Sequence, residues 1–237
     1  MIILGMDTSS VNATVSVMND KKLVAEYIIS NDRTHSVIIM PLLEDMLKKS
    51  GLTLNDVDVF ASAIGPGSFT GLRIGIASVK TLAQAKGKPV VGINSLESLS
   101  ANFDLCTDAI ICPIIDARHK QVYTALYENS SEICPPKVEE LDQLLSELEK
   151  NGKKVIFCGD GVLAYGEYID SKNNPLWCVA PQHLSMQKAS SLCYAAYKRA
   201  QKGDFDNLYT LAPLYLRRSQ AERELDAKRQ VEAASNS

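Results

Sequence analysis

The feature of this sequence that most constrains its fold is an order of strands and helices that occurs twice. Apolar runs at 1–9, 13–20, 22–30, 56–65 and 88–94 predict strands, and longer periodic segments at 33–50 and 70–86 predict helices. Residues 109–202 show a similar series, with two strands around the polar turn 116–121, a helix over 138–151, a strand at 154–161 and a helix from about 184 to 202. The duplicated order predicts a two-lobed α/β protein.

The chain divides into three parts on this interpretation. We expect an N-terminal lobe at residues 1–103, a C-terminal lobe at 104–216 and a charged tail at 217–237, where core-forming side chains are almost absent.

The net charge of −3 does not favour a stand-alone nucleic-acid binder. The start, "MIILGMDTSS", has no basic region, and no apolar run approaches the length of a membrane span, so we expect a cytoplasmic protein.

The glycine-rich stretch "GPGSFTGLRIGIA" lies between a predicted strand and a predicted helix, which raises the question of phosphate binding. Its spacing, G-x-G-x-x-x-G, is one residue longer than the dinucleotide fingerprint, and no Gly-Lys-Ser/Thr of a Walker loop follows. We interpret Gly65 and Gly67 as a tight turn around Pro66, and Gly71 and Gly75 as positions that thin one face of the helix.

Both helices of the first lobe carry more packing surface than one sheet needs. In the helix at 70–86, the bulky apolar side chains occupy one face, and a second face has almost no side chains. The helix at 33–50 carries apolar residues over more than the usual stripe. Two interpretations stay open: the helices are buried inside a larger domain, or they present a surface to a partner.

Four segments together resemble the TsaB (YeaZ) family: "MDTSS", "RTHSVIIMPLLEDML", "GPGSFTGLRIG" and "APLYLRR". The resemblance runs from residue 2 to about 218 and implies a two-lobed actin/sugar-kinase/Hsp70-like (ASKHA) fold. It further implies a partner subunit that binds a TsaD-like catalytic paralogue and, with it, recruits a TsaE-like ATPase. The product of such a complex is threonylcarbamoyladenosine beside the anticodon of tRNAs that read codons beginning with A.

The resemblance also assigns the partner contact to the first two helices, and it implies that the same surface forms a homodimer when the protein is alone. It implies that tRNA is contacted only indirectly, through the complex. The basic turn at 118–120 does not require a tRNA contact, because such a cluster is typical of a solvated hairpin tip. On the two helices we expect these interface residues: His35, Ile39, Leu43, Met46, Gly71, Gly75, Ser78 and Leu82.

The chain lacks the metal-binding pair of the catalytic paralogues, which is an H-x-x-x-H motif. When "NSLESLSA" is aligned on its glutamate, Glu97, the two histidine positions fall on Ser95 and Leu99. The three histidines of the chain lie in separate segments. We therefore expect no metal and no catalytic residue, and we expect an accessory subunit that is not an enzyme by itself.

Nucleotide chemistry is the second hypothesis, because the ASKHA fold hosts kinases and ATPases. The first hairpin keeps Asp7, Thr8 and Ser9 but has no glycine between Asp7 and Ser16, and the second hairpin has none after Asp116. Glycines at such turns let the backbone approach a phosphate. We therefore expect no required cofactor. A weak nucleotide-binding ATPase stays open as the alternative, with a vestigial site at Asp7, Thr8 and Ser9 or with ADP or ATP at the heterodimer boundary.

Overall fold

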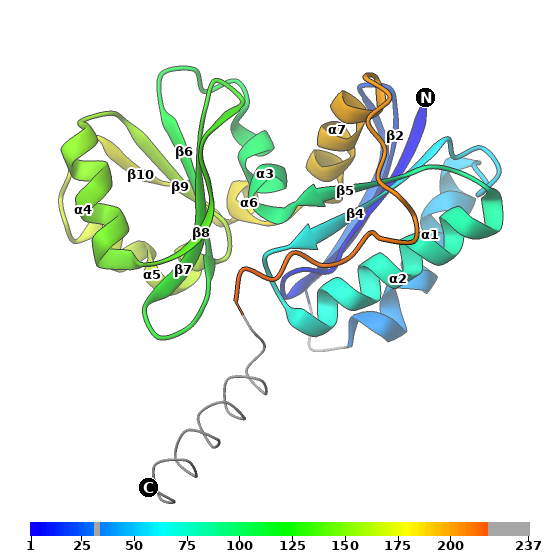
Figure 1. Cartoon of the computed structure of the whole chain (residues 1–237), viewed down its shortest axis with the longest axis horizontal. Coiled ribbons are helices and arrows are strands. Elements are labelled where there is room, and N and C mark those ends of the chain that lie inside the picture. The colour runs from blue at the N-terminus through cyan, green and yellow to red at the C-terminus, as the bar shows by residue number, and fades with distance from the viewer. Residues whose placement is uncertain (31–33, 218–237) are drawn as a thin grey trace, which may run out of the picture.

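The computed structural model describes residues 1–30 and 34–217, which form two lobes, each built on a five-stranded sheet (Figure 1). The first sheet has the order β3-β2-β1-β4-β5, and the second has the matching order β8-β7-β6-β9-β10. The prediction of a duplicated, two-lobed α/β fold is confirmed. The strands are β1 (Ile2–Asp7), β2 (Asn12–Asn19), β3 (Lys22–Ser30), β4 (Val59–Gly65), β5 (Val90–Asn94), β6 (Ile110–Asp116), β7 (Gln121–Glu128), β8 (Ser131–Glu140), β9 (Val155–Cys158) and β10 (Trp177–Val179).

The two sheets share their strand directions as well as their order. In the first, β1, β4 and β5 run parallel and β2 and β3 form an antiparallel meander; in the second, β6, β9 and β10 run parallel beside the antiparallel β7 and β8. Because parallel strands end at one edge of a sheet, Asp7 and Gly65 lie together in the first lobe. Asp116 and Cys158 end the equivalent strands of the second. Such edges are where ligand clefts form in open α/β sheets.

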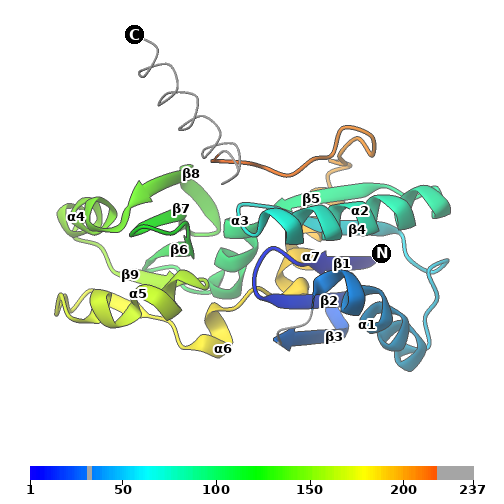
Figure 2. The same cartoon turned by 90° about the horizontal axis from the view of Figure 1, so that it is seen from below.

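Helices cover both faces of each sheet (Figures 1 and 2). In the first lobe, α1 (His35–Ser50) and α2 (Phe69–Lys86) share one core with the sheet, and α7 (Ala189–Ala200) packs on the opposite face. In the second, α4 (Leu141–Asn151) and α5 (Gly161–Asp170) cover one face, and α3 (Ser95–Ser100), followed by the 3-10 turn η1 (Ala101–Phe103), packs on the other. The short α6 (Gln182–Ser185) precedes α7.

The position of α7 differs from the sequence-based division of the chain. That division assigned residues 104–216 to the second lobe, but α7 buries Leu192, Cys193 and Ala196 against the first sheet. Residues 206–214 also return to the first lobe, where the Asp206 and Leu214 amides donate to carbonyl groups of Val90 and Ile64. The first lobe is therefore completed by the end of the described chain. The tail predicted from residue 217 lies, beyond Arg217 itself, outside the described residues.

The two long helices of the first lobe end where their glycines predicted. Gly51 and Gly87 adopt left-handed φ angles of 69° and 61°, and each donates its N–H to carbonyls of the preceding turn. These are the usual glycine caps of helix C-termini.

Within residues 1–30 and 34–217, no helix has the length and apolar character needed to cross a membrane.

Candidate functional site

The glycine-rich turn between β4 and α2 packs against the turn between β1 and β2. The Ser68 amide donates to the Ser9 carbonyl at 2.7 Å, and the Thr8 hydroxyl donates to the Gly71 carbonyl at 2.7 Å. A Cβ atom on Gly67 or Gly71 would collide with the carbonyl oxygens of Ser9 or Thr8. The glycines therefore allow two backbone segments of the same lobe to approach each other closely.

This packing corrects part of the interface predicted from the sequence. Gly71 and Gly75 face the β1–β2 turn rather than a partner, because their missing side chains make room for Thr8. On α1, the apolar residues predicted at the interface lie in the core of the first lobe and cover its sheet. Five predicted interface residues are thus buried within the monomer: Ile39, Leu43, Met46, Gly71 and Gly75.

The other three predicted interface residues are half-buried. Ser78 and Leu82 lie at the edge of the solvent-facing side of α2. His35 begins α1, where its Nε2 atom lies 2.8 Å from the Ser10 carbonyl and its buried Nδ1 has no partner within the part of the chain that the structure describes. These residues are therefore accessible at most in part.

A different face of α1 and α2 is left open to solvent. On α1, Val37 is 66% exposed and Met40 is 40% exposed, and the exposed Pro41 lies beside them. On α2, the exposed positions carry short side chains at Ala77 and Thr81. The two helices pack on the same side of the first sheet (Figure 2), so their exposed sides belong to one face of the lobe.

An apolar groove of about 580 Å³ lies on this surface beside the second half of α1. Met40 and Pro41 form one side, and Leu52 and Leu54 of the loop after α1 form another. Glu44 and Lys48 supply its charged lining residues. An apolar groove edged by charged groups is the surface type that marks a protein-binding site.

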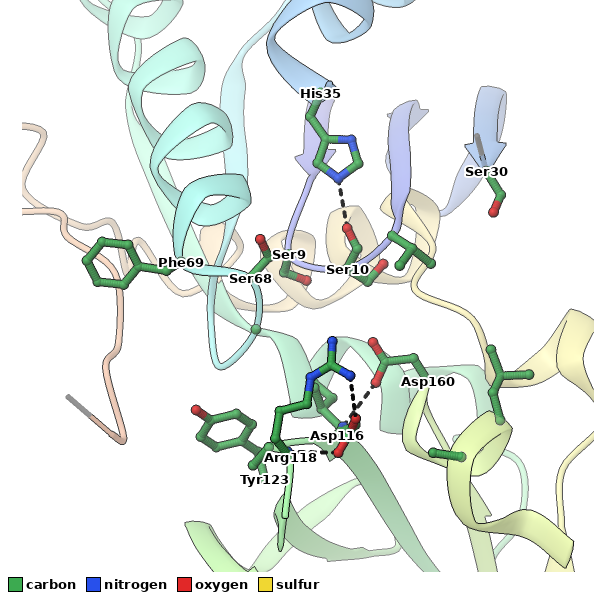
Figure 3. A pocket seen from close by; sticks show the side chains of 16 residues that line it. Ser9, Ser10, Ser30, His35, Ser68, Phe69, Asp116, Arg118, Tyr123 and Asp160 are labelled. Atoms are coloured by element: carbon green, nitrogen blue, oxygen red, sulfur yellow. Dashed lines mark hydrogen bonds and ion pairs between the residues drawn. The ribbon is translucent and has the colours of Figure 1, made fainter. Parts of the chain in front are cut away.

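A separate cleft of about 1090 Å³ lies between the lobes (Figure 3). Residues from both lobes line it, with Ser9, Ser10 and Ser68 on one side and Asp116, Arg118 and Asp160 on the other (Figure 3). This is the cleft that the ends of the parallel strands predict, and it is the place where an ASKHA fold would hold a nucleotide.

Three carboxyl groups lie at or near this cleft. Burial raises the pKa of Asp160 to about 6, and the nearby charges of Asp116 and Asp7 act in the same direction. Asp116 accepts hydrogen bonds from the Arg118 amide at 2.8 Å and the Tyr165 hydroxyl at 2.9 Å. Asp7 is fully buried, and burial raises its pKa although the Ser9 amide donates to it at 2.8 Å. Asp7 therefore caps its own turn rather than facing the cleft.

Several backbone groups at the turns around the cleft are engaged within the protein. In the first hairpin, the Ser9 amide donates to Asp7, and the Asn12 amide donates to the Ser10 hydroxyl at 3.1 Å. The Ser68 amide at the glycine turn donates to the Ser9 carbonyl. In the second hairpin, the Arg118 amide donates to Asp116, and Arg118 itself lies 3.6 Å from the same carboxylate. The amides of Ser9, Asn12, Ser68 and Arg118 are thus not free to form part of a phosphate cradle.

Ser95 and Leu99, which stand where catalytic paralogues have histidines, are fully buried in α3. Leu99 packs in the core of the second lobe, so no side chain that could bind a metal occupies this position. Among residues 1–30 and 34–217, no three His, Cys, Asp or Glu side chains are grouped so that they could hold a metal ion.

The end of the described chain adds contacts that the sequence reasoning did not assign. The Tyr215 ring stacks on Phe69 at 4.7 Å, and its hydroxyl accepts from the Arg73 side chain at 3.0 Å. Arg217 then donates to the Ala117 carbonyl in the second lobe at 3.0 Å. Residues 214–217 therefore run from the first lobe to the second (Figure 1), and they contact Phe69 and Ala117, two residues that line the cleft. The segment "APLYLRR" contributes to the family resemblance, but no local pattern in it predicts these partners.

Comparison with known proteins gives a consistent result. Residues 22–225 match the family model described as "TsaD: tRNA N6-adenosine threonylcarbamoyltransferase". The "tRNA threonylcarbamoyladenosine biosynthesis protein TsaB" of Bacillus subtilis is 30% identical over 226 residues, covering 94% of this chain and 96% of that protein. The TsaB protein of Escherichia coli is 35% identical over 129 residues, or 54% of this chain and 55% of that protein.

Solved structures show the same fold. YeaZ from Pseudomonas aeruginosa superposes with a TM-score of 0.74 at 23% identity, covering 91% of this chain and 99% of that one. Component A of the (R)-2-hydroxyglutaryl-CoA dehydratase of Acidaminococcus fermentans gives a TM-score of 0.51 at 12% identity, with 85% and 99% coverage. The similarity to this ASKHA-type neighbour is a similarity of fold alone.

Proposed function

The chain belongs to the TsaB (YeaZ) family, and from that premise we propose that it acts in the formation of threonylcarbamoyladenosine on tRNA as a non-catalytic partner subunit. In this role it binds and supports a TsaD-like threonylcarbamoyltransferase, together with a TsaE-like ATPase. The modified position lies next to the anticodon of tRNAs reading A-starting codons. Such a complex acts on tRNA in the cytoplasm, and this subunit contacts the tRNA only through the complex.

The observation that carries the proposal is the open face of α1 and α2, together with the apolar groove beside it. Val37, Met40 and Pro41 form an exposed apolar strip, and Leu52 and Leu54 extend it across the groove. The side chains of Ala77 and Thr81 on the adjoining part of α2 are short, so the backbone of a second helix can approach α2 closely there. We propose that a TsaD-like paralogue of the same fold uses its corresponding helices to cover this face.

The same surface supports a homodimer when the protein is alone. A self-complementary contact of this kind is isologous, with the helix pair of one protomer packed on the helix pair of the other. Because one face accepts only one occupant, the homodimer and the TsaD-like complex exclude each other.

The non-catalytic part of the proposal is supported by α3 and by the cleft. The buried Leu99 stands at a position where the catalytic paralogue needs a histidine, and the amides of Ser9, Asn12 and Ser68 are engaged within the protein. The subunit therefore needs no metal and no cofactor of its own. A nucleotide at the heterodimer boundary would have to be held largely by the partner.

One experiment tests the whole proposal. The full chain is mixed with a TsaD-like protein and a TsaE-like ATPase, and the formation of threonylcarbamoyladenosine on tRNA is measured with and without this chain. We expect a stable complex with the TsaD-like protein and modification that depends on this chain. Full modification in its absence, or no complex by size-exclusion chromatography at micromolar concentration, would contradict the proposal.

A further inference from the structure

A second polar pocket lies at the opposite end of strands β6 and β7 from the cleft. Asp116, at the end of β6, lines the cleft, whereas Tyr127, which pairs with Ile111 near the start of β6, lines this pocket. Its volume is about 300 Å³. The walls come from α3, from the start of the loop after η1, from α7 and from the β7–β8 hairpin, so both lobes contribute to it.

The charges around the pocket are unbalanced. Three carboxylates line it, on Glu97, Asp104 and Glu132, against one ammonium group, on Lys198. Lys198 lies 3.2 Å from Asp104 and over the Tyr194 ring, so these two opposite charges compensate each other. Within residues 1–30 and 34–217, neither Glu97 nor Glu132 forms a salt bridge. Two negative charges are therefore left facing one cavity.

Among the described residues, the neighbouring cations pair with other carboxylates and form no salt bridge with Glu97. Arg199, the next residue after Lys198, donates to Asp204, Asp206 and the Gly92 carbonyl. Burial raises the pKa of Glu97; the charges of Lys198 and Arg199 oppose this rise, and the smaller effects of Glu132 and Asp104 add to it. A further cation bound beside this carboxylate would favour its charged form.

A buried hydroxyl points to a ligand independently of these charges. Tyr127 is only 4% exposed, and its hydroxyl has no hydrogen-bond partner within the described chain. Leaving a buried polar group without a partner costs free energy. The phenol oxygen can accept an N–H from a molecule bound in the pocket, and this would remove the cost.

The size and spacing of the site favour an organic cation over a metal ion. Among residues 1–30 and 34–217, these carboxylates do not form a group that could hold one metal ion. A volume of about 300 Å³ is at the lower end of small-molecule pockets. Glu97 and Glu132 belong to different walls, one on α3 and one on the β7–β8 hairpin, so one ligand with two separate cationic groups can meet both.

We propose that this pocket binds a small aliphatic diamine, with one ammonium group at Glu97, the other at Glu132, and one N–H donated to the Tyr127 hydroxyl. Binding joins α3 to the β7–β8 hairpin through two charge-assisted hydrogen bonds. The inference is independent of the partner-subunit role, because none of these residues belongs to the open face of α1 and α2.

The test is isothermal titration calorimetry of the full chain with 1,4-diaminobutane in a buffer of low ionic strength. We expect one diamine per chain, and we expect butylamine, which has one ammonium group, to bind at least about tenfold more weakly. Glu97→Gln and Glu132→Gln keep the side-chain shapes and should each weaken binding by about tenfold. Tyr127→Phe should weaken binding less. Glu149→Gln, which removes one exposed carboxylate from α4, should leave binding unchanged.

Several results would overturn the proposal. The absence of saturable binding to the wild-type chain at millimolar diamine would do so, as would unchanged affinity in Glu97→Gln with the fold intact by circular dichroism. Equal affinity for butylamine would show that two carboxylates do not act together. Displacement of the diamine by equimolar Mg²⁺ would identify a metal site instead.

Discussion

The hydroxyl oxygen of Thr8 lies 2.6 Å from the position that a Cβ atom would take on Gly75. The same hydroxyl donates to the Gly71 carbonyl at 2.7 Å, one helical turn earlier, so it cannot move away without losing that hydrogen bond. The closeness of α2 to the end of β1 therefore depends on a residue without a side chain at position 75. The sequence-based expectation placed Gly75 at a partner interface, whereas in the structure Gly75 is buried inside the lobe.

Gly75→Leu should therefore destabilise the monomer. Overpacking against Thr8 typically costs about 1–3 kcal/mol, and this outweighs the gain of up to about 1 kcal/mol in helix propensity. The measurement is the free energy of unfolding from urea titration. The matched control is Ala85→Leu, which adds a similar side chain at an exposed position on the same helix. If Gly75→Leu is as stable as Ala85→Leu, the packing against Thr8 is not as tight as the structure indicates.

The order of most strands and helices along the chain could be predicted because buried strands form continuous runs of Val, Ile and Ala, which differ from the periodic pattern of the long helices. Among the elements that were missed, three have identifiable physical reasons. β8 contains Pro135 and Pro136, which are tolerated because β8 is an edge strand of its sheet. α3 is only 6 residues long, and α5 begins with Gly161, which is a weak helix former.

For the candidate interface, the sequence could indicate which two helices carry it but not which of their residues face solvent. The patterns of α1 and α2 show that each has an excess of apolar or small positions, but a helical wheel does not say which face meets the sheet. In the structure, Ile39, Leu43 and Met46 fill the core, and the exposed Val37 and Met40 form the open face. This distinction depends on long-range packing, which is also why the contacts of Tyr215 and Arg217 were not predicted.

Met40→Glu should abolish the homodimer and the complex with a TsaD-like protein while the fold is kept. Met40 is 40% exposed on the apolar groove, so the monomer tolerates a charge there, whereas a partner would have to bury that charge on an apolar surface. Light scattering and co-purification measure the two assemblies. Leu176→Glu, which changes a side chain of similar exposure (38%) on the second lobe, is the control and should leave both assemblies intact. Equal loss with both variants would mean that charge alone, rather than this face, governs association.

Highly purified protein should hydrolyse ATP no faster than the Asp116→Asn/Asp160→Asn double variant. The amides of Ser9, Asn12 and Ser68 are bonded within the protein, so the cleft offers little stabilisation to a transferring phosphoryl group. Release of inorganic phosphate measures the rate. Turnover in the wild-type chain that the double variant loses would favour the alternative of a weak ATPase.

The pKa of Asp160 predicts how stability changes with pH. The carboxyl titrates near 3.8 in the unfolded chain and at about 6 in the folded protein, where burial disfavours its charge. Between these values the folded protein binds more protons than the unfolded chain, so this group makes stability fall as the pH rises and has no further effect above about pH 6. Asp160→Asn removes the ionisation while the side-chain oxygen can still accept from the Asp116 amide.

The variant Asp160→Asn should therefore be more stable than the wild type at pH 7, by up to about 3 kcal/mol, and the difference should shrink as the pH falls towards 4. Urea unfolding of both proteins at several values between pH 4 and pH 7 measures this difference. Asp170→Asn, which removes an exposed carboxylate from the end of α5, controls for the change in net charge and should show a much smaller dependence. A difference that stays constant across this range would show that Asp160 does not titrate there, and that its carboxylate is better solvated in the cleft than its burial implies.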